Sequence, residues 1–166
     1  MKAKLLFITL TLITFCAVAQ KEAEKTTPSP IVAYGEPITL ETAKKILNAA
    51  QAFAATKQWT VVIAIVDTGG NLVLLEKFDN TQIGSIEVAI GKAKTANNFK
   101  RPTKAYEDGI ATGGAGLRVL NVPGITPVEG GEPIFFNGKI IGGIGVSGMK
   151  STEDGEVVKA GLAALK

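Results

Sequence analysis

The sequence predicts an α/β (α+β) domain in which helices pack against an antiparallel sheet. The apolar residues alternate between helical and strand periodicity, in the order helix, strand, strand, helix, loop, strand, strand, helix. Consecutive strands are joined by short turns, which favours hairpins over a doubly wound parallel sheet. The chain has 166 residues, 46% of them apolar, which fits one domain with its own core.

The first half of the domain is predicted to form a helix and a hairpin. Thr39 is suited to cap the helix that follows it. Residues 59–66 are rich in β-branched side chains and predict a strand covered on both faces. A turn over residues 67–71 then leads into a second strand over residues 72–78.

The middle of the domain is predicted to be helical and then irregular. Small and apolar residues at helical spacing predict a helix over residues 85–99, with Ser85 as its cap. A short helix is expected over residues 103–110. Residues 111–126 are rich in glycine and are predicted to be irregular.

The end of the chain contains the clearest hairpin signal. Asn137-Gly138 suits a type I′ turn between strands over residues 133–136 and 139–146. Ser151 or Thr152 is expected to cap a last helix over residues 153–165.

Composition excludes several classes of protein. The chain has no histidine, which excludes Ser-His-Asp and Cys-His catalysis, His-ligated zinc and His-ligated haem iron. Cys16 is the only cysteine. Without residues 1–19, which hold two lysines and no acid, the net charge falls from +3 to +1. The charges are scattered, so no nucleic-acid partner is expected.

Residues 1–19 have the features of a secretory signal peptide. Lys2 and Lys4 precede an apolar run over residues 5–15, and Ala17-Val18-Ala19 is an A-x-A cleavage site. The apolar run is shorter than the ~20 residues of a transmembrane helix. We therefore expect a periplasmic or secreted protein with no membrane attachment after cleavage.

The chain beyond the cleavage site divides into two parts. Residues 20–35 are mostly polar and contain two prolines, which predicts a disordered linker. The folded domain is predicted to span residues 36–166. The alternative of acylation at Cys16 is disfavoured, because Thr14 and Phe15 stand where a lipoprotein signal needs small residues.

Three motifs invite catalytic or nucleotide-binding interpretations that their context does not favour. Residues 143–148 match G-x-G-x-x-G, but no second strand of a βαβ unit and no acidic residue ~20 positions later follow. Ser147 lacks the G-x-S-x-G spacing of a nucleophile elbow. Glu129 and Glu132 could form a carboxylate pair, but solvated turn charges are the simpler interpretation.

A basic cluster lies near the end of the second long predicted helix: Lys92, Lys94, Lys100 and Arg101. Cations there are favourable beside a helix C-terminus. They could equally anchor the carboxylates of a ligand through charge-assisted hydrogen bonds. The sequence leaves both interpretations open.

Several ordered motifs together resemble the GlcG/HbpS-like family, also described as a haem-binding or haem-degrading domain. The resemblance covers about residues 36–166. The motifs are Asp67-Thr68-Gly69-Gly70-Asn71-Leu72, Ala89-x-x-Lys92-Ala93-x-Thr95-Ala96-x-x-Phe99-x-Arg101-x-Thr103, Gly130-Gly131-x-Pro133-Ile134 and Ile141-Gly142-Gly143-Ile144-Gly145-Val146-Ser147-Gly148.

The resemblance implies a profilin-like α/β/α sandwich with a five-stranded antiparallel sheet, usually assembled into homo-oligomers. Some secreted members bind haem and are linked to its degradation and to redox sensing. Other relatives accompany glycolate-use enzymes or form the C-terminal part of a cobalamin adenosyltransferase. Function must therefore be argued from the site.

We expect an exported haem- or tetrapyrrole-binding protein, with a small-molecule (carboxylate) binding or oligomeric scaffold protein without haem as the alternative. No catalytic residue is predicted, since an enzyme would have to use carboxylates, Lys, Tyr or the chemistry of its cofactor. In the absence of histidine, an axial ligand of haem iron would be Tyr34, Tyr106, Met149, a lysine or the Thr95 hydroxyl. The ligand is expected between the second long helix and the loops at 113–116 and 130–133. The predicted cofactor-binding residues are Lys94, Thr95, Arg101, Tyr106, Gly130, Gly131 and Met149.

Overall fold

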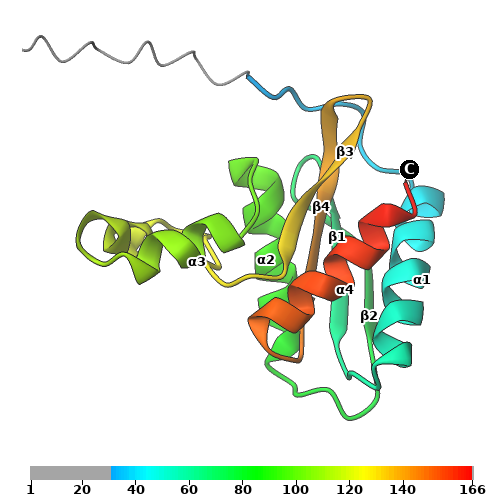
Figure 1. The fold of residues 1–166 in the computed structure, drawn as a ribbon. Helices are drawn as coiled ribbons and strands as arrows, with labels where there is room; N and C mark the ends of the chain where they lie inside the picture. Colours follow the sequence, from blue (N-terminus) through cyan, green and yellow to red (C-terminus); the bar gives the residue numbers. More distant parts are fainter. Residues whose placement is uncertain (1–30, 166) are drawn as a thin grey trace, which may run out of the picture. The chain divides into compact units, whose positions relative to one another are not determined.

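The computed structural model describes residues 31–165, which belong to one compact unit (Figure 1). The predicted signal peptide and residues 20–30 of the predicted linker lie outside the described residues. Across residues 31–165, no helix combines the length and the apolar character needed to cross a bilayer.

Four antiparallel strands form the sheet, in the spatial order β2-β1-β4-β3. Their bounds are β1 Val62–Asp67, β2 Leu72–Lys77, β3 Gly131–Phe136 and β4 Lys139–Ser147. Both predicted hairpins are confirmed. Asn137 and Gly138 have φ of 48° and 74°, the left-handed conformation that a type I′ turn requires.

Helices cover both faces of the sheet (Figure 1). The helices α1 (Leu40–Thr56) and α4 (Ser151–Ala163) pack together on one face, and α2 (Ser85–Phe99) covers the other. The short helix α3 (Lys104–Ala111) and the 3-10 helix η1 (Gly114–Asn121) extend away from the sheet. The predicted arrangement of helices on both faces of an antiparallel sheet is confirmed.

The five-stranded sheet is not observed among the described residues. In place of a fifth strand, Tyr34 forms an isolated parallel bridge with Ile140 of β4. The bridge lies on the side of β4 that pairs with β1, just beyond the end of β1. The bridge does not extend along β4, where Gly142 already pairs with Asp67 of β1. One further backbone hydrogen bond, from the Ile38 N–H to Ile141 O at 2.8 Å, joins this segment to β4 before α1 begins.

Glycines in β4 let α2 approach the strand closely. A Cβ atom at Gly143 would lie 2.4 Å from Ala93 O, and one at Gly145 would lie 2.1 Å from Ala89 O. The G-x-G-x-x-G match therefore serves packing within the chain.

The structure confirms one predicted helix cap and corrects two others. Thr39 accepts a hydrogen bond from the N–H of Thr42 at 3.2 Å, as predicted. Ser85 is not a cap, because its hydroxyl instead meets that of Ser147 at 3.2 Å. Helix α4 begins at Ser151, so neither Ser151 nor Thr152 caps it, and the Glu153 carboxylate accepts from the Lys150 N–H.

The segment predicted to be irregular contains regular structure. Residues 114–121 form η1, which begins after Gly113 at a φ of 67°. The glycines favour this tight turn without preventing a 3-10 helix, which needs only short-range hydrogen bonds.

Candidate functional site

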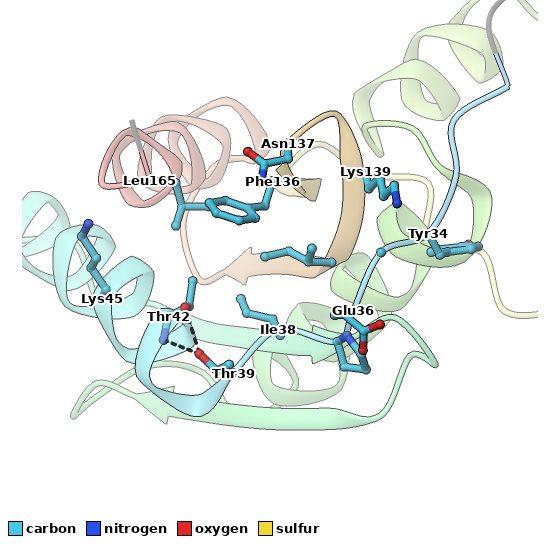
Figure 2. A pocket seen from close by; sticks show the side chains of 13 residues that line it. Tyr34, Glu36, Ile38, Thr39, Thr42, Lys45, Phe136, Asn137, Lys139 and Leu165 are labelled. Atoms are coloured by element: carbon cyan, nitrogen blue, oxygen red, sulfur yellow. Dashed lines mark hydrogen bonds between the residues drawn. The ribbon is translucent and has the colours of Figure 1, made fainter.

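A cleft of about 690 Å³ lies between the N-terminal segment, α1 and the tip of the β3–β4 hairpin (Figure 2). We call it the hairpin cleft. Residues from four parts of the chain line it: Tyr34, Gly35, Glu36, Pro37, Ile38, Thr39, Thr42, Lys45, Phe136, Asn137, Lys139, Ile141 and Leu165.

The floor of the hairpin cleft is apolar. Ile38 and Ile141 belong to the apolar core on the α1/α4 face, and Leu165 packs against that core. Phe136 stands at the hairpin tip with 55% of its surface exposed. An aromatic ring this exposed beside a cleft offers an apolar contact surface to a ligand.

Two lysines flank this floor. Figure 2 shows Lys45, from α1, and Lys139, from β4, on opposite sides of it. Among residues 31–165, neither ammonium group has an ion-pair partner within 4.0 Å. Glu36 is the one acidic residue of the lining. The cleft therefore suits a ligand with an apolar body and negative charge.

Tyr34 lines the hairpin cleft, but its hydroxyl is directed elsewhere (Figure 2). The hydroxyl donates to Asn97 O at 2.8 Å, and burial raises the pKa of the phenol. The Lys100 ammonium lies 4.4 Å from the centre of the Tyr34 ring and donates to Val32 O at 2.7 Å. Lys100, which the sequence placed in a basic cluster, thus fastens the N-terminal segment.

The two predicted site residues on α2 have different surroundings. Lys94 is exposed. Thr95 is fully buried, and its hydroxyl donates to Gly91 O at 2.8 Å and accepts from the Thr126 N–H at 2.8 Å. This hydroxyl holds the loop after η1 against α2.

Arg101 and Tyr106 lie together beyond the end of α2. The Arg101 guanidinium lies 5.5 Å from the centre of the Tyr106 ring, and that ring meets Phe99 edge to face at 6.1 Å. Burial raises the pKa of the half-buried Tyr106 phenol, and the charge of Arg101 acts in the opposite direction.

The two predicted site glycines are packed inside the protein. Gly131 donates its N–H to the Thr103 hydroxyl and accepts from the Thr103 N–H, both at 2.9 Å. A Cβ atom at Gly130 would lie 2.8 Å from the Cβ of Asp154. These glycines serve internal packing.

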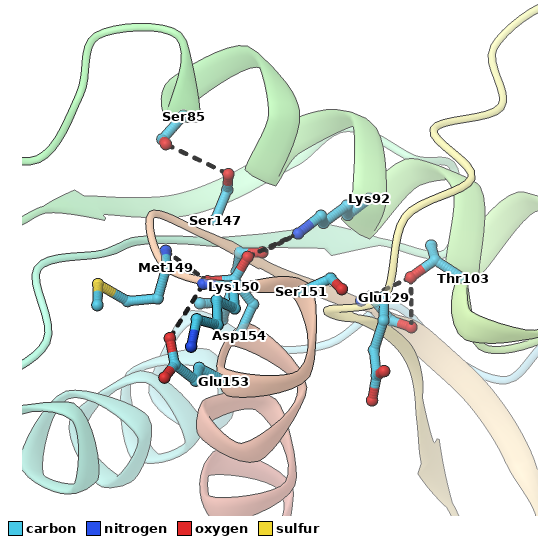
Figure 3. Close-up of polar contacts among 12 residues, drawn as sticks. Ser85, Lys92, Thr103, Glu129, Ser147, Met149, Lys150, Ser151, Glu153 and Asp154 are labelled. Atoms are coloured by element: carbon cyan, nitrogen blue, oxygen red, sulfur yellow. Dashed lines mark hydrogen bonds and ion pairs between the residues drawn. The ribbon is translucent and has the colours of Figure 1, made fainter. Parts of the chain in front are cut away.

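Beside these glycines, a buried ion pair joins α2 to α4 (Figure 3). Lys92 Nζ donates to Asp154 Oδ2 at 2.8 Å and to Val146 O at 2.9 Å, and both charged side chains are almost fully buried. Burial raises the pKa of the Asp154 carboxyl, while Lys92 and the Met149 N–H act in the opposite direction.

The structure does not gather the predicted residues into one cavity. Met149 packs against the apolar core on the α1/α4 face of the sheet, whereas Lys94 and Thr95 belong to α2 on the other face. Sequence reasoning also missed Lys45, Phe136 and Lys139. The one available signal was the pair Phe135-Phe136 directly before the turn, in a chain with only 6% aromatic residues.

Comparisons with known proteins agree on one family. The family model described as "Haem degrading protein HbpS-like" matches residues 38–163. Protein GlcG of Escherichia coli strain K12 is 35% identical over 110 residues, which are 66% of this chain and 81% of that protein. The crystal structure of HbpS superposes with a TM-score of 0.73 at 29% identity, covering 84% of this chain and 98% of that one. The crystal structure of a PduOC–haem complex gives a TM-score of 0.71 at 27% identity, covering 78% and 96%.

Proposed function

The chain belongs to the HbpS-like family, described as haem-degrading, and on that premise we propose that it binds haem or a related tetrapyrrole in the hairpin cleft. The observation that carries the proposal is the apolar floor between two lysines without ion-pair partners. One structural relative, PduOC, forms a complex with haem.

The lining of the cleft fits the organic part of haem. Ile38, Phe136, Ile141 and Leu165 would contact the apolar macrocycle, and Lys45 and Lys139 would meet its carboxylates. When bound, haem would supply redox-active iron. The lining fits the iron less well, because it offers no imidazole, thiolate or thioether, and the Tyr34 hydroxyl is engaged by Asn97.

A haemin titration followed by the Soret absorbance tests the proposal. Phe136→Ala should weaken binding by about tenfold, since it removes apolar contact worth roughly 1.5 kcal/mol. The paired variant Lys94→Ala/Arg101→Ala tests the binding surface predicted from the sequence, and we expect it to bind haemin normally. If only the paired variant loses binding, the ligand lies at the α2 surface. If the unaltered protein gives no saturable change, the alternative of a carboxylate-binding or scaffold protein without haem takes precedence.

The protein is further proposed to act as a homo-oligomer. The family resemblance implies such an assembly. The small residues of α2 and β4 are not a surface for it, because they pack against each other within the chain. A better candidate surface is α3 with η1, in which no residue is buried and Leu117 and Leu120 are 45% and 60% exposed. Light scattering that gives a monomer mass at micromolar concentration would contradict this proposal.

Export is proposed from the sequence of residues 1–19. Together with the proposed tetrapyrrole binding, export would give the protein a role in haem handling or redox sensing outside the cytoplasm. The intact mass of the secreted or periplasmic protein should be that of a chain beginning at Gln20, with or without the loss of ammonia that converts Gln20 to pyroglutamate. A mass that shows an uncleaved Met1 or diacylglycerol on Cys16 would exclude this cleavage.

A further inference from the structure

We infer that the hairpin cleft recognises an apolar carboxylate ligand through its organic periphery, so that a metal-free porphyrin binds as tightly as haemin. This inference rests on the proposed tetrapyrrole-binding function. It assigns the recognition to Lys45, Lys139 and the apolar floor, and it assigns no role to the metal.

The polar groups of the lining explain why the metal should contribute little. Lys45 and Lys139 carry ammonium groups, which donate hydrogen bonds and have no lone pair for a metal. The Tyr34 hydroxyl donates to Asn97 O at 2.8 Å, on the side of α2. The Thr39 hydroxyl donates to the Thr42 hydroxyl at 2.9 Å.

Glu36 is the one carboxylate of the lining and so its strongest candidate ligand for a metal. Figure 2 shows it on the Tyr34 side of the cleft, away from Phe136 and Leu165. A macrocycle in contact with the apolar floor would therefore have its centre away from this carboxylate. The charged groups on either side of the floor are the ammonium groups of Lys45 and Lys139, which suit negative charge.

Charge complementarity identifies the periphery as the recognised part of the ligand. Lys45 and Lys139 stand on opposite sides of the floor, and neither has an ion-pair partner within 4.0 Å among residues 31–165. Glu36 leaves the lining with one surplus positive charge. A ligand carboxylate would form charge-assisted hydrogen bonds with these ammonium groups, whereas an ester could not accept them with the same strength.

The test compares three ligands on the purified protein: haemin by Soret absorbance, and protoporphyrin IX and its dimethyl ester by porphyrin fluorescence. Haemin and protoporphyrin IX should bind with dissociation constants within about threefold of each other. The dimethyl ester should bind at least tenfold more weakly. The variant Lys45→Ala/Lys139→Ala should weaken both acids at least tenfold, and Lys44→Ala, an exposed α1 residue outside the cleft, should weaken neither.

Each other outcome has a definite meaning. If haemin binds and protoporphyrin IX binds at least tenfold more weakly, the metal is recognised and this inference is wrong, while the proposed function stands. If both acids bind but the double lysine variant or the ester binds equally well, the assignment to Lys45 and Lys139 is wrong. If neither acid binds, the proposed tetrapyrrole-binding function fails, and this inference fails with it.

Discussion

The buried pair Lys92–Asp154 should be the most sensitive polar contact of the fold. Lys92 is only 1% exposed and Asp154 only 2%, and the pair joins α2 to α4 across β4. Removing one partner of a buried pair leaves an uncompensated charge and costs about 3–5 kcal/mol. Lys92→Met keeps an unbranched side chain as far as Cε but deprives both Asp154 Oδ2 and Val146 O of a donor. We therefore expect it to lower the free energy of unfolding by about 3–5 kcal/mol.

A double-mutant cycle separates the pair from its surroundings. Asp154→Asn should also cost about 3–5 kcal/mol, because it leaves the Lys92 ammonium buried without a negative partner. Lys92→Met/Asp154→Asn removes both charges, so its cost should be less than the sum of the two single costs by at least about 2 kcal/mol.

Urea unfolding can be followed by the fluorescence of Trp59, the single tryptophan, which packs edge to face with Phe53 at 6.1 Å. The matched control is Lys104→Met, which breaks the exposed pair with Asp108 on α3. Because both side chains of that pair are exposed to solvent, the change should leave the free energy of unfolding nearly unaltered. Single costs below about 1 kcal/mol, or strictly additive costs in the double variant, would refute the argument that this pair is desolvated and coupled.

Two further predictions concern packing and pH. Gly145→Ala should lower the free energy of unfolding in urea by about 3 kcal/mol, because the added Cβ would lie 2.1 Å from Ala89 O. The control Gly109→Ala, where nothing lies within 4 Å of the added Cβ, should be neutral or stabilising by up to about 1 kcal/mol. Equal effects of the two variants would contradict the close approach of α2 to β4. Burial raises the pKa of the Glu132 carboxyl, so ionisation of this group opposes folding. The protonated carboxyl contributes its full stability below the pKa of the unfolded chain, and this contribution is lost as the pH rises through the pKa of the folded protein. Glu132→Gln should therefore unfold at higher urea concentration than the unaltered protein at pH 7, with the difference disappearing below about pH 4; a variant less stable at pH 7 would show that the charge of Glu132 is needed.

Local sequence signals predicted most of the fold because their physical causes are local. Asn137-Gly138 adopts the two positive φ values of its turn without help from distant residues. Thr39 caps α1 through the N–H of Thr42, three residues away. The start of α4 was placed two residues too late, because Ser151 and Thr152 were expected to cap the helix and instead lie in its first turn.

Lys92 shows why a long-range polar contact escapes such reasoning. Ala89, Lys92, Ala93 and Ala96 follow the spacing of one helix face, and that face packs against the sheet. A lysine in a helix is ordinarily solvated, so the sequence left open only two solvent-facing roles for Lys92, favourable charge near a helix C-terminus and a ligand anchor. Its partner Asp154 lies 62 residues further along the chain, and no local pattern connects the two.

The hairpin cleft could not be predicted for a related reason. Its walls come from the segment before α1, from α1 itself, from the β3–β4 hairpin and from Leu165, so the cleft exists only once these parts pack together. Each lining residue is ordinary in its own segment, as an exposed lysine on a helix or an isoleucine beside a core. Phe136 is the exception, because a half-exposed aromatic ring at a hairpin tip contributes little to the core. For the binding proposed in the hairpin cleft, Phe136→Ala is therefore the variant that most directly separates a binding surface from a structural one.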